Sequence, residues 1–127
     1  MLRSSPDNAW QQILSSHFRE FLAFFFPRLE RAIDWRTKPI FLDKELQKIL
    51  PKSAVGSRVA DKLVKVRLRS PGITWILIHV EVEARPGKRF PERIYVYNSK
   101  IFDRYGVKVV SLVVVTGRTQ WKPQPYR

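Results

Sequence analysis

Acidic side chains and a histidine recur at alternate positions in Thr74–Ala84, which has the sequence TWILIHVEVEA. Successive side chains of a strand point to opposite faces, so His79, Glu81 and Glu83 would share one face. The even positions between them are aliphatic. A strand of this kind can bury its aliphatic face in a core and present two carboxylates and an imidazole on the other face.

A neighbouring strand is predicted to bring a third carboxylate to the same face. Val59–Leu68 also alternates, and the turn signal RSPG follows it, so the two runs should form a hairpin. Because the aliphatic faces both occupy even positions, the numbers of paired residues must sum to an even value. A five-residue loop over Arg69–Ile73 then places Asp61 directly opposite Glu81.

Two carboxylates that face each other across a strand pair destabilise it, so they favour a cation between them. For Asp61 and Glu81, one interpretation is a divalent metal site. The other is an ordinary ion-pair network in which Lys62 or Arg93 is the partner. For His79, a structural role is the alternative to a role in the site.

Composition predicts a single domain over residues 1–127 with a strongly positive surface. The chain has 127 residues, of which 44% are hydrophobic, and this is enough for a core. It carries 24 Lys and Arg against 11 Asp and Glu, a net charge of +13. Such a charge favours a polyanionic partner, nucleic acid first. The alternatives are solubility and attraction to an anionic membrane, but no basic amphipathic helix of the interfacial kind is evident.

The sequence shows neither a signal peptide nor an apolar run long enough to span a bilayer. Cysteine is absent, which excludes disulfides and thiolate metal sites and fits a reducing compartment. We therefore expect a cytoplasmic protein with no membrane partner.

Helices are predicted on the N-terminal side of the hairpin. Aromatic and leucine side chains recur every three or four residues over Pro6–Phe25, which favours one helix. Pro27 ends it, and Leu29–Trp35 could form a second helical turn. Phe41–Leu50 fits a helix, although a strand at Ile40–Leu42 is an alternative opening.

A helix and a last strand are predicted on the C-terminal side. Phe90–Arg104 has Pro and Glu in its first turn and Gly106 beyond its end. Val107–Thr116 is nearly continuous valine, which is typical of a strand buried on both faces. A helix between two strands favours a right-handed parallel crossover. Residues 119–127 are predicted to form an irregular tail.

These residues resemble a known family. Asp61, with Glu81-Val82-Glu83 on the adjacent strand, is similar to the core of the PD-(D/E)XK nucleases. The closer resemblance is to the recombination-promoting nuclease and putative transposase family, especially its cyanobacterial-type members. It covers nearly the whole chain in order, and because members run well past this point, the chain resembles their nuclease core only. The similar stretches are FLAFFFP (21–27), IDW (33–35), LDKEL (42–46), DKLVKV (61–66), IHVEV (78–82), ERIYVYN (92–98), DRY (103–105) and WKP (121–123).

The resemblance implies an α/β protein with the restriction-endonuclease-like αβββαβ core, a mixed central sheet flanked by helices. It implies a metal-dependent endonuclease that hydrolyses DNA phosphodiester bonds in recombination or mobile-element events. Mg²⁺ or Mn²⁺ would be held by Asp61, Glu81 and the backbone carbonyl of Val82, and the catalytic residues would be Asp61, Glu81 and Glu83. Whether the domain is a monomer or a homodimer is left open.

The chain departs from the family at position 83, where the family has Lys, or often Gln, to position or activate the water. Glu83 cannot supply positive charge, and Lys65 could compensate only from a place opposite Leu77. A DNA-binding remnant that does not cleave is therefore the alternative function, and a subunit-interface or scaffold module is a third. DNA contacts are expected from Lys65, His79, Arg93, Tyr97 and Lys100. For the last three, which lie on the predicted helix, the alternative is a solvated helix face with a packed tyrosine.

Overall fold

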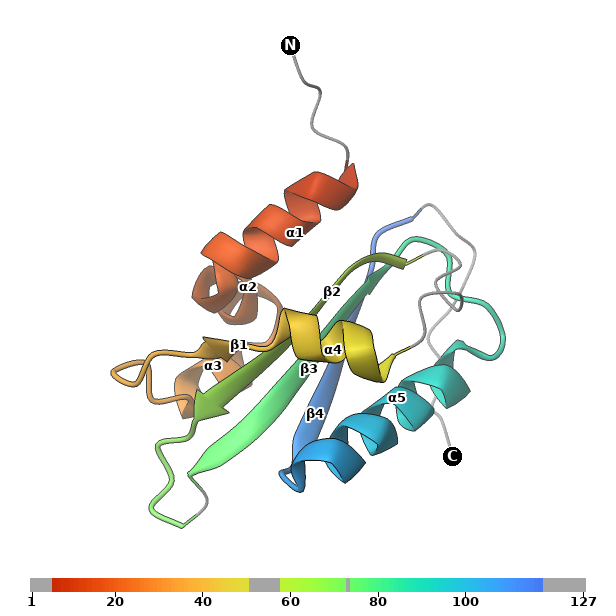
Figure 1. Ribbon diagram of the computed structural model, residues 1–127. Coiled ribbons are helices and arrows are strands. Elements are labelled where there is room, and N and C mark those ends of the chain that lie inside the picture. Colours follow the sequence, from red (N-terminus) through yellow and green to blue (C-terminus); the bar gives the residue numbers. More distant parts are fainter. Residues whose placement is uncertain (1–5, 51–57, 73, 118–127) are drawn as a thin grey trace.

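The computed structural model describes residues 6–50, 58–72 and 74–117, which form a four-stranded sheet flanked by helices (Figure 1). The strand order is β1-β2-β3-β4. The β1–β2 and β2–β3 pairs are antiparallel and β3–β4 is parallel, so the sheet is mixed, as expected. The elements are α1 (Pro6–Ser16), α2 (Phe18–Phe25), α3 (Pro27–Ala32), β1 (Ile40–Phe41), α4 (Asp43–Ile49), β2 (Arg58–Arg67), β3 (Trp75–Glu83), α5 (Phe90–Tyr105) and β4 (Val109–Val115).

The β2–β3 hairpin has the predicted register. Asp61 pairs with Glu81, and where the loop closes the Leu68 N–H donates to the Thr74 carbonyl at 2.7 Å. The alternating pattern specifies this register, because a slip of one residue would turn the aliphatic side chains of one strand to the opposite face.

Each face of the sheet is covered by its own helices. The red-to-orange helices α1 and α2 pack on the aliphatic face, and yellow α4 and cyan α5 pack on the other face (Figure 1). The first core contains Leu14, Phe18, Phe21, Leu22, Ile33, Ala60, Val64, Val66, Ile76, Ile78, Val80, Val82, Leu112 and Val114. The second contains Leu46, Leu50, Leu63, Leu77, Tyr97 and Ile101.

The single helix predicted over Pro6–Phe25 is interrupted at His17, which separates α1 from α2. His17 has φ −132° and ψ 40°, outside the helical range, although its N–H donates to the Ile13 carbonyl at 2.8 Å. Periodicity does not reveal the break, because both pieces keep an apolar side on the sheet, through Leu14 and Phe21. The helical turn predicted over Leu29–Trp35 corresponds to α3, which begins earlier, at Pro27, and ends earlier, at Ala32. The ambiguous stretch after it contains both a strand, β1, and a helix, α4.

β4 is less buried than predicted. Leu112 and Val114 are buried, whereas the other side chains of the strand are half-buried. The strand is last in the sheet order, so it lacks the cover of a central strand. The parallel pairing across the β3–α5–β4 crossover is confirmed. The predicted tail over 119–127 lies outside the described residues, and within those residues no helix is long and apolar enough to cross a membrane.

A buried lysine joins two helices to β2. The Lys62 side chain is 5% exposed, and its Nζ donates to Ser15 Oγ of α1 at 2.7 Å and to Asp43 Oδ2 of α4 at 2.9 Å. Nζ also lies 5.6 Å from the ring centroid of Phe41 in β1. A buried ammonium is costly without such partners, so these contacts hold α1 and α4 against β2.

Candidate functional site

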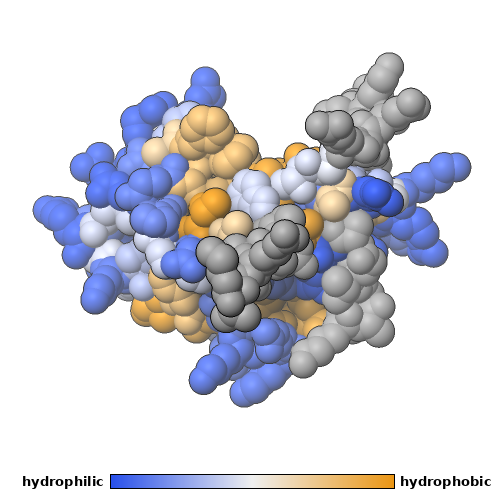
Figure 2. Space-filling view, turned by 90° about the horizontal axis from the view of Figure 1, so that it is seen from above, coloured by the Kyte–Doolittle hydropathy of each residue, from blue (hydrophilic) through white to orange (hydrophobic). Residues whose placement is uncertain are grey.

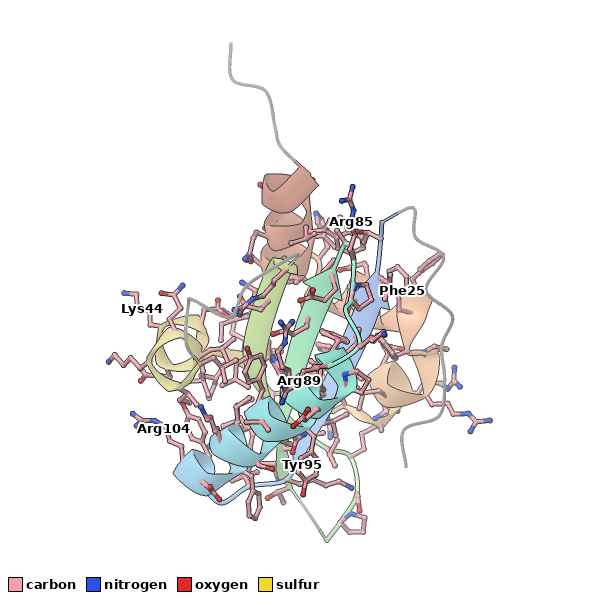
Figure 3. All side chains as sticks on the ribbon, turned by 90° about the vertical axis from the view of Figure 1, so that its right-hand side faces the viewer. Phe25, Lys44, Arg85, Arg89, Tyr95 and Arg104 are labelled. Carbon is pink, nitrogen blue, oxygen red and sulfur yellow. The ribbon has the colours of Figure 1, made fainter. Side chains whose placement is uncertain are left out.

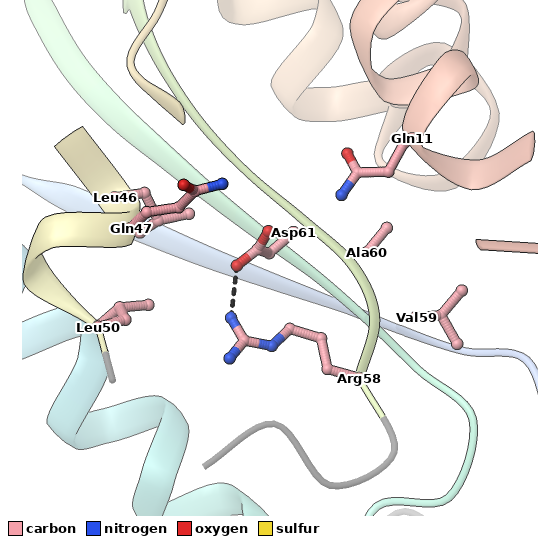
Figure 4. Close-up of a pocket in the computed structure, with 8 residues that line it drawn as sticks. All are labelled: Gln11, Leu46, Gln47, Leu50, Arg58, Val59, Ala60 and Asp61. Atoms are coloured by element: carbon pink, nitrogen blue, oxygen red, sulfur yellow. Dashed lines mark hydrogen bonds and ion pairs between the residues drawn. The ribbon is translucent and has the colours of Figure 1, made fainter. Parts of the chain in front are cut away.

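A pocket opens beside the predicted acidic pair, at the edge of β2 (Figure 4). β1 pairs only with Val64 and Lys65, so among the described residues the first part of β2 has no strand on its outer side. The pocket between α1, α4 and this edge has a volume of about 210 Å³. Its lining residues are Gln11, Leu46, Gln47, Leu50, Arg58, Val59, Ala60 and Asp61.

The predicted acidic residues lie together, but they differ in exposure. The Asp61 side chain lines the pocket and is 20% exposed, whereas Glu81 and Glu83 are 1% and 0% exposed. The polar face of β3 is therefore buried as well as the aliphatic one. Helices cover it as well, and α5 lies across the strands (Figure 3). Of the three carboxylates, Asp61 is the one that an incoming ligand would meet first.

Arg58 supplies positive charge between the two facing carboxylates. Its Nη1 lies 2.5 Å from Asp61 Oδ2 and 3.7 Å from Glu81 Oε1, and its side chain is 10% exposed. In a regular strand, residues 58 and 61 would point to opposite faces. A bulge between Arg58 and Ala60 breaks this alternation and sets Arg58 opposite Glu83, on the carboxylate face.

The sequence had pointed to Lys62 or Arg93 as the ion-pair partner. Lys62 instead pairs with Asp43 of α4, at 2.9 Å. The Arg93 guanidinium lies 5.6 Å from the ring centroid of Phe90. Arg58 was missed because it precedes the predicted strand, and regular alternation would assign it to the aliphatic face. The one signal for it was its position as a basic residue directly before that strand.

Glu81 is a buried carboxylate held in its charged form. Burial raises its pKa, but contacts with His79 and Glu83 and the charge of Arg58 outweigh burial, so the pKa lies below the ordinary value. His79 Nε2 lies 3.5 Å from Glu81 Oε1. Within the part of the chain that the structure describes, neither carboxylate oxygen of Glu81 has a well-formed hydrogen bond. These buried oxygens are therefore available to a cation.

His79 is tied to the neighbouring strand rather than presented at the surface. Its Nδ1 lies 3.2 Å from Ser111 Oγ in β4, and Asn98 Nδ2 of α5 donates to the same Oγ at 3.0 Å. Its ring packs edge-on against Tyr97, with the centroids 6.4 Å apart. Both rings are buried, so neither presents a surface to DNA.

The remaining residues expected to contact DNA lie apart from the acidic pair. Lys65 Nζ lies 5.0 Å from the ring centroid of Trp75, at the hairpin-loop end of the sheet, so Lys65 does not compensate for Glu83. Lys100 is exposed on α5, and Arg93 is half-buried there. Tyr97 is packed, as in the helix alternative, and DNA contact by Arg93 and Lys100 stays a prediction.

Asp61 and Glu81 have the donor chemistry that Mg²⁺ and Mn²⁺ prefer, since such ions take oxygen ligands and bind one or two carboxylates while keeping waters. The buried oxygens of Glu81, which have no well-formed hydrogen bond among the described residues, fit this chemistry. The described residues contain no group of three or more His, Cys, Asp or Glu side chains arranged to hold a metal ion. The ligand set would therefore be two carboxylates and the predicted carbonyl of Val82, and Arg58 lies between the two carboxylates.

Comparison with known proteins identifies no relative of this chain. No family model matches the chain, and neither a curated protein nor a solved structure matches it. The functional interpretation therefore depends on the acidic residues, on Arg58 and on the charge of the chain.

Proposed function

We propose that this chain is a metal-dependent DNA endonuclease domain with the restriction-endonuclease-like fold, similar to the recombination-promoting nuclease and putative transposase family. Mg²⁺ or Mn²⁺ is the proposed cofactor. The observation that carries the proposal is the direct opposition of Asp61 and Glu81 on β2 and β3, beside a pocket at the edge of β2. The mixed sheet with helices on both faces supports it.

Asp61 and Glu81 would hold the metal ion, with the carbonyl of Val82 as a further ligand. A bound Mg²⁺ or Mn²⁺ would polarise the phosphate and lower the pKa of a water molecule. Asp61, at the pocket, would face the incoming phosphate, and His79 would orient Glu81 through their 3.5 Å contact. Glu83 could accept a proton but offers no positive charge to the reacting phosphate. We therefore expect slow cleavage.

The charge distribution supports DNA as the substrate. Hydrophilic side chains project at several places along the rim of the molecule in Figure 2, and the chain carries a net charge of +13. Arg31 and Arg69 have no ion-pair partner within the described residues, so their charges are available to phosphates. They belong to a second pocket of about 400 Å³, lined by Arg19, Glu30, Arg31, Ile33, Asp34, Trp35, Arg36 and Arg69.

Nicking of supercoiled plasmid under single-turnover conditions tests the proposal. The wild-type chain should nick with Mn²⁺ or Mg²⁺ and not with EDTA, and Asp61→Asn and Glu81→Gln should abolish nicking. Asp103→Asn and Glu20→Gln make the same changes at exposed positions and should nick like the wild type. Nicking that survives in Asp61→Asn and Glu81→Gln would exclude the proposed site.

The second candidate function is DNA binding without cleavage. The specific observation in its favour is that Arg58 neutralises the acidic pair from within the chain, so the pair is stable without a metal ion. The two functions differ in one result. A non-cleaving domain would bind DNA at low salt and leave the plasmid intact at every metal concentration.

A further inference from the structure

Arg58 already lies where a metal ion bridging the two carboxylates would bind. Its Nη1 is 2.5 Å from Asp61 Oδ2 and 3.7 Å from Glu81 Oε1. Because Mg²⁺ binds oxygen at about 2.0–2.1 Å, an ion bound to these two oxygens would lie in the space that the guanidinium fills. Two cations so close repel each other strongly in a site that is largely closed to water. One of them must leave before the other binds.

We propose that Arg58 is a resident cation that a divalent metal must displace, and that the displaced guanidinium then binds the substrate phosphate in the pocket. This inference rests on the proposed function, since it requires the acidic pair to bind a metal. It also explains how the chain could compensate for Glu83. Arg58 is the direct cross-strand partner of Glu83. Its positive charge therefore lies next to the position where the nuclease family that the chain resembles has Lys or Gln.

The pocket gives the displaced side chain a place to go. Arg58 lines it together with the amide side chains of Gln11 and Gln47, each of which carries an acceptor oxygen (Figure 4). Arg58 is also the first residue of β2, beyond the bulge that interrupts its pairing with β3. A rotation of its side chain would therefore move the guanidinium without disturbing the hairpin. A guanidinium binds phosphate oxygens through two parallel hydrogen bonds, and it stays charged at any working pH.

Loss of Arg58 should have two opposite effects. Without a metal, removal of its charge leaves buried carboxylates with less compensation, so the fold should lose stability. With a metal, the same removal frees the site, so metal affinity should rise. A residue with a purely structural role would produce the first effect and not the second.

Calorimetric titration with Mn²⁺ tests the inference on the wild type, Arg58→Gln and Arg28→Gln. Arg28 is exposed on α3, so its substitution is the matched control for charge. Arg58→Gln should bind Mn²⁺ about tenfold more tightly than the wild type, in the range usual for coupled binding, and Arg28→Gln should match the wild type. In EDTA, Arg58→Gln should melt at a lower temperature, and Mn²⁺ should raise its melting temperature more than that of the wild type.

The outcomes separate the inference from the proposed function. Equal Mn²⁺ affinity in Arg58→Gln and the wild type would overturn displacement and leave the metal site intact. No Mn²⁺ binding in any variant would overturn both. If Arg58→Gln does not fold, displacement can be tested in the wild type by NMR of the Arg58 Nε–H resonance. This resonance is assigned by its loss in Arg58→Lys. It should shift when Mg²⁺ is added, and an unchanged resonance would refute the inference.

Discussion

Ser111 Oγ lies 3.2 Å from Nδ1 of His79, its direct partner across the parallel strands β4 and β3. Asn98 Nδ2 donates to the same Oγ, which leaves the Ser111 hydroxyl able to donate to Nδ1 or to accept from it. Because Nε2 of His79 faces the carboxylate oxygen Oε1 of Glu81, we expect the ring proton of neutral His79 on Nε2 and the Ser111 hydroxyl as the donor to Nδ1.

Ser111→Ala should remove the donor to Nδ1 and leave a buried ring nitrogen unpaired. We expect a loss of about 1–3 kcal/mol in the free energy of unfolding, measured by urea denaturation. Nitrogen NMR should show the Nε2–H tautomer of His79 in the wild type and a mixture of tautomers in the variant. Ser99→Ala, on the same helix as Asn98, is the control. A single Nε2–H tautomer that persists in Ser111→Ala would show that Ser111 does not determine the tautomer.

Acidification in metal-free buffer should destabilise the fold through Glu81. Its folded pKa lies below the ordinary value of 4.5, so its contribution to stability is complete above that value. The contribution is lost as the pH falls through the folded pKa. We expect the free energy of unfolding to decline from about pH 5 downward, and to decline less in Glu81→Gln. Glu20→Gln, at an exposed position, should follow the wild-type curve. If the free energy of unfolding declines equally with acid in all three proteins, Glu81 is not the cause of the decline.

DNA binding should weaken steeply with salt and depend little on sequence, because the positive charge acts on phosphates. Arg31→Gln and Arg69→Gln together should reduce the slope of log affinity against log salt by about 2, one for each lost phosphate contact. Arg28→Gln combined with Arg104→Gln makes the same change in charge at exposed positions outside the second pocket. If both double variants reduce the slope equally, Arg31 and Arg69 do not make specific contacts with the DNA phosphates.

Glu83→Gln should raise the single-turnover cleavage rate, or at least not lower it, and should loosen the metal slightly. The amide can donate a hydrogen bond to the attacking water, whereas an ionised carboxylate at position 83 cannot. Rates measured at saturating Mn²⁺ separate the chemical step from metal affinity. Loss of a measurable wild-type activity in this variant would show that Glu83 itself acts as a base or metal ligand.

The acidic pair could be predicted from the sequence because its position depends only on the two strands and the loop between them. A period of two and a short turn signal are enough to place Asp61 opposite Glu81. The position of Arg58 could not be predicted, since it depends on a bulge, and a bulge leaves no mark in the alternation. Burial of Glu81 was missed for a different reason. Alternation shows that a face is polar, and it does not show whether α5 packs over that face.

The contacts of Lys62 have a consequence for the shape of the pocket. Ser15 and Asp43, the two groups that Lys62 joins, lie one helical turn from Gln11 and Gln47, which line the pocket on α1 and α4. Lys62 therefore fixes the distance between α1 and α4 at one end of the pocket. A longer or shorter side chain at position 62 would change the distance between the two helices at the other end, beside Asp61. A residue that touches no ligand would thus set how wide the mouth of the pocket is.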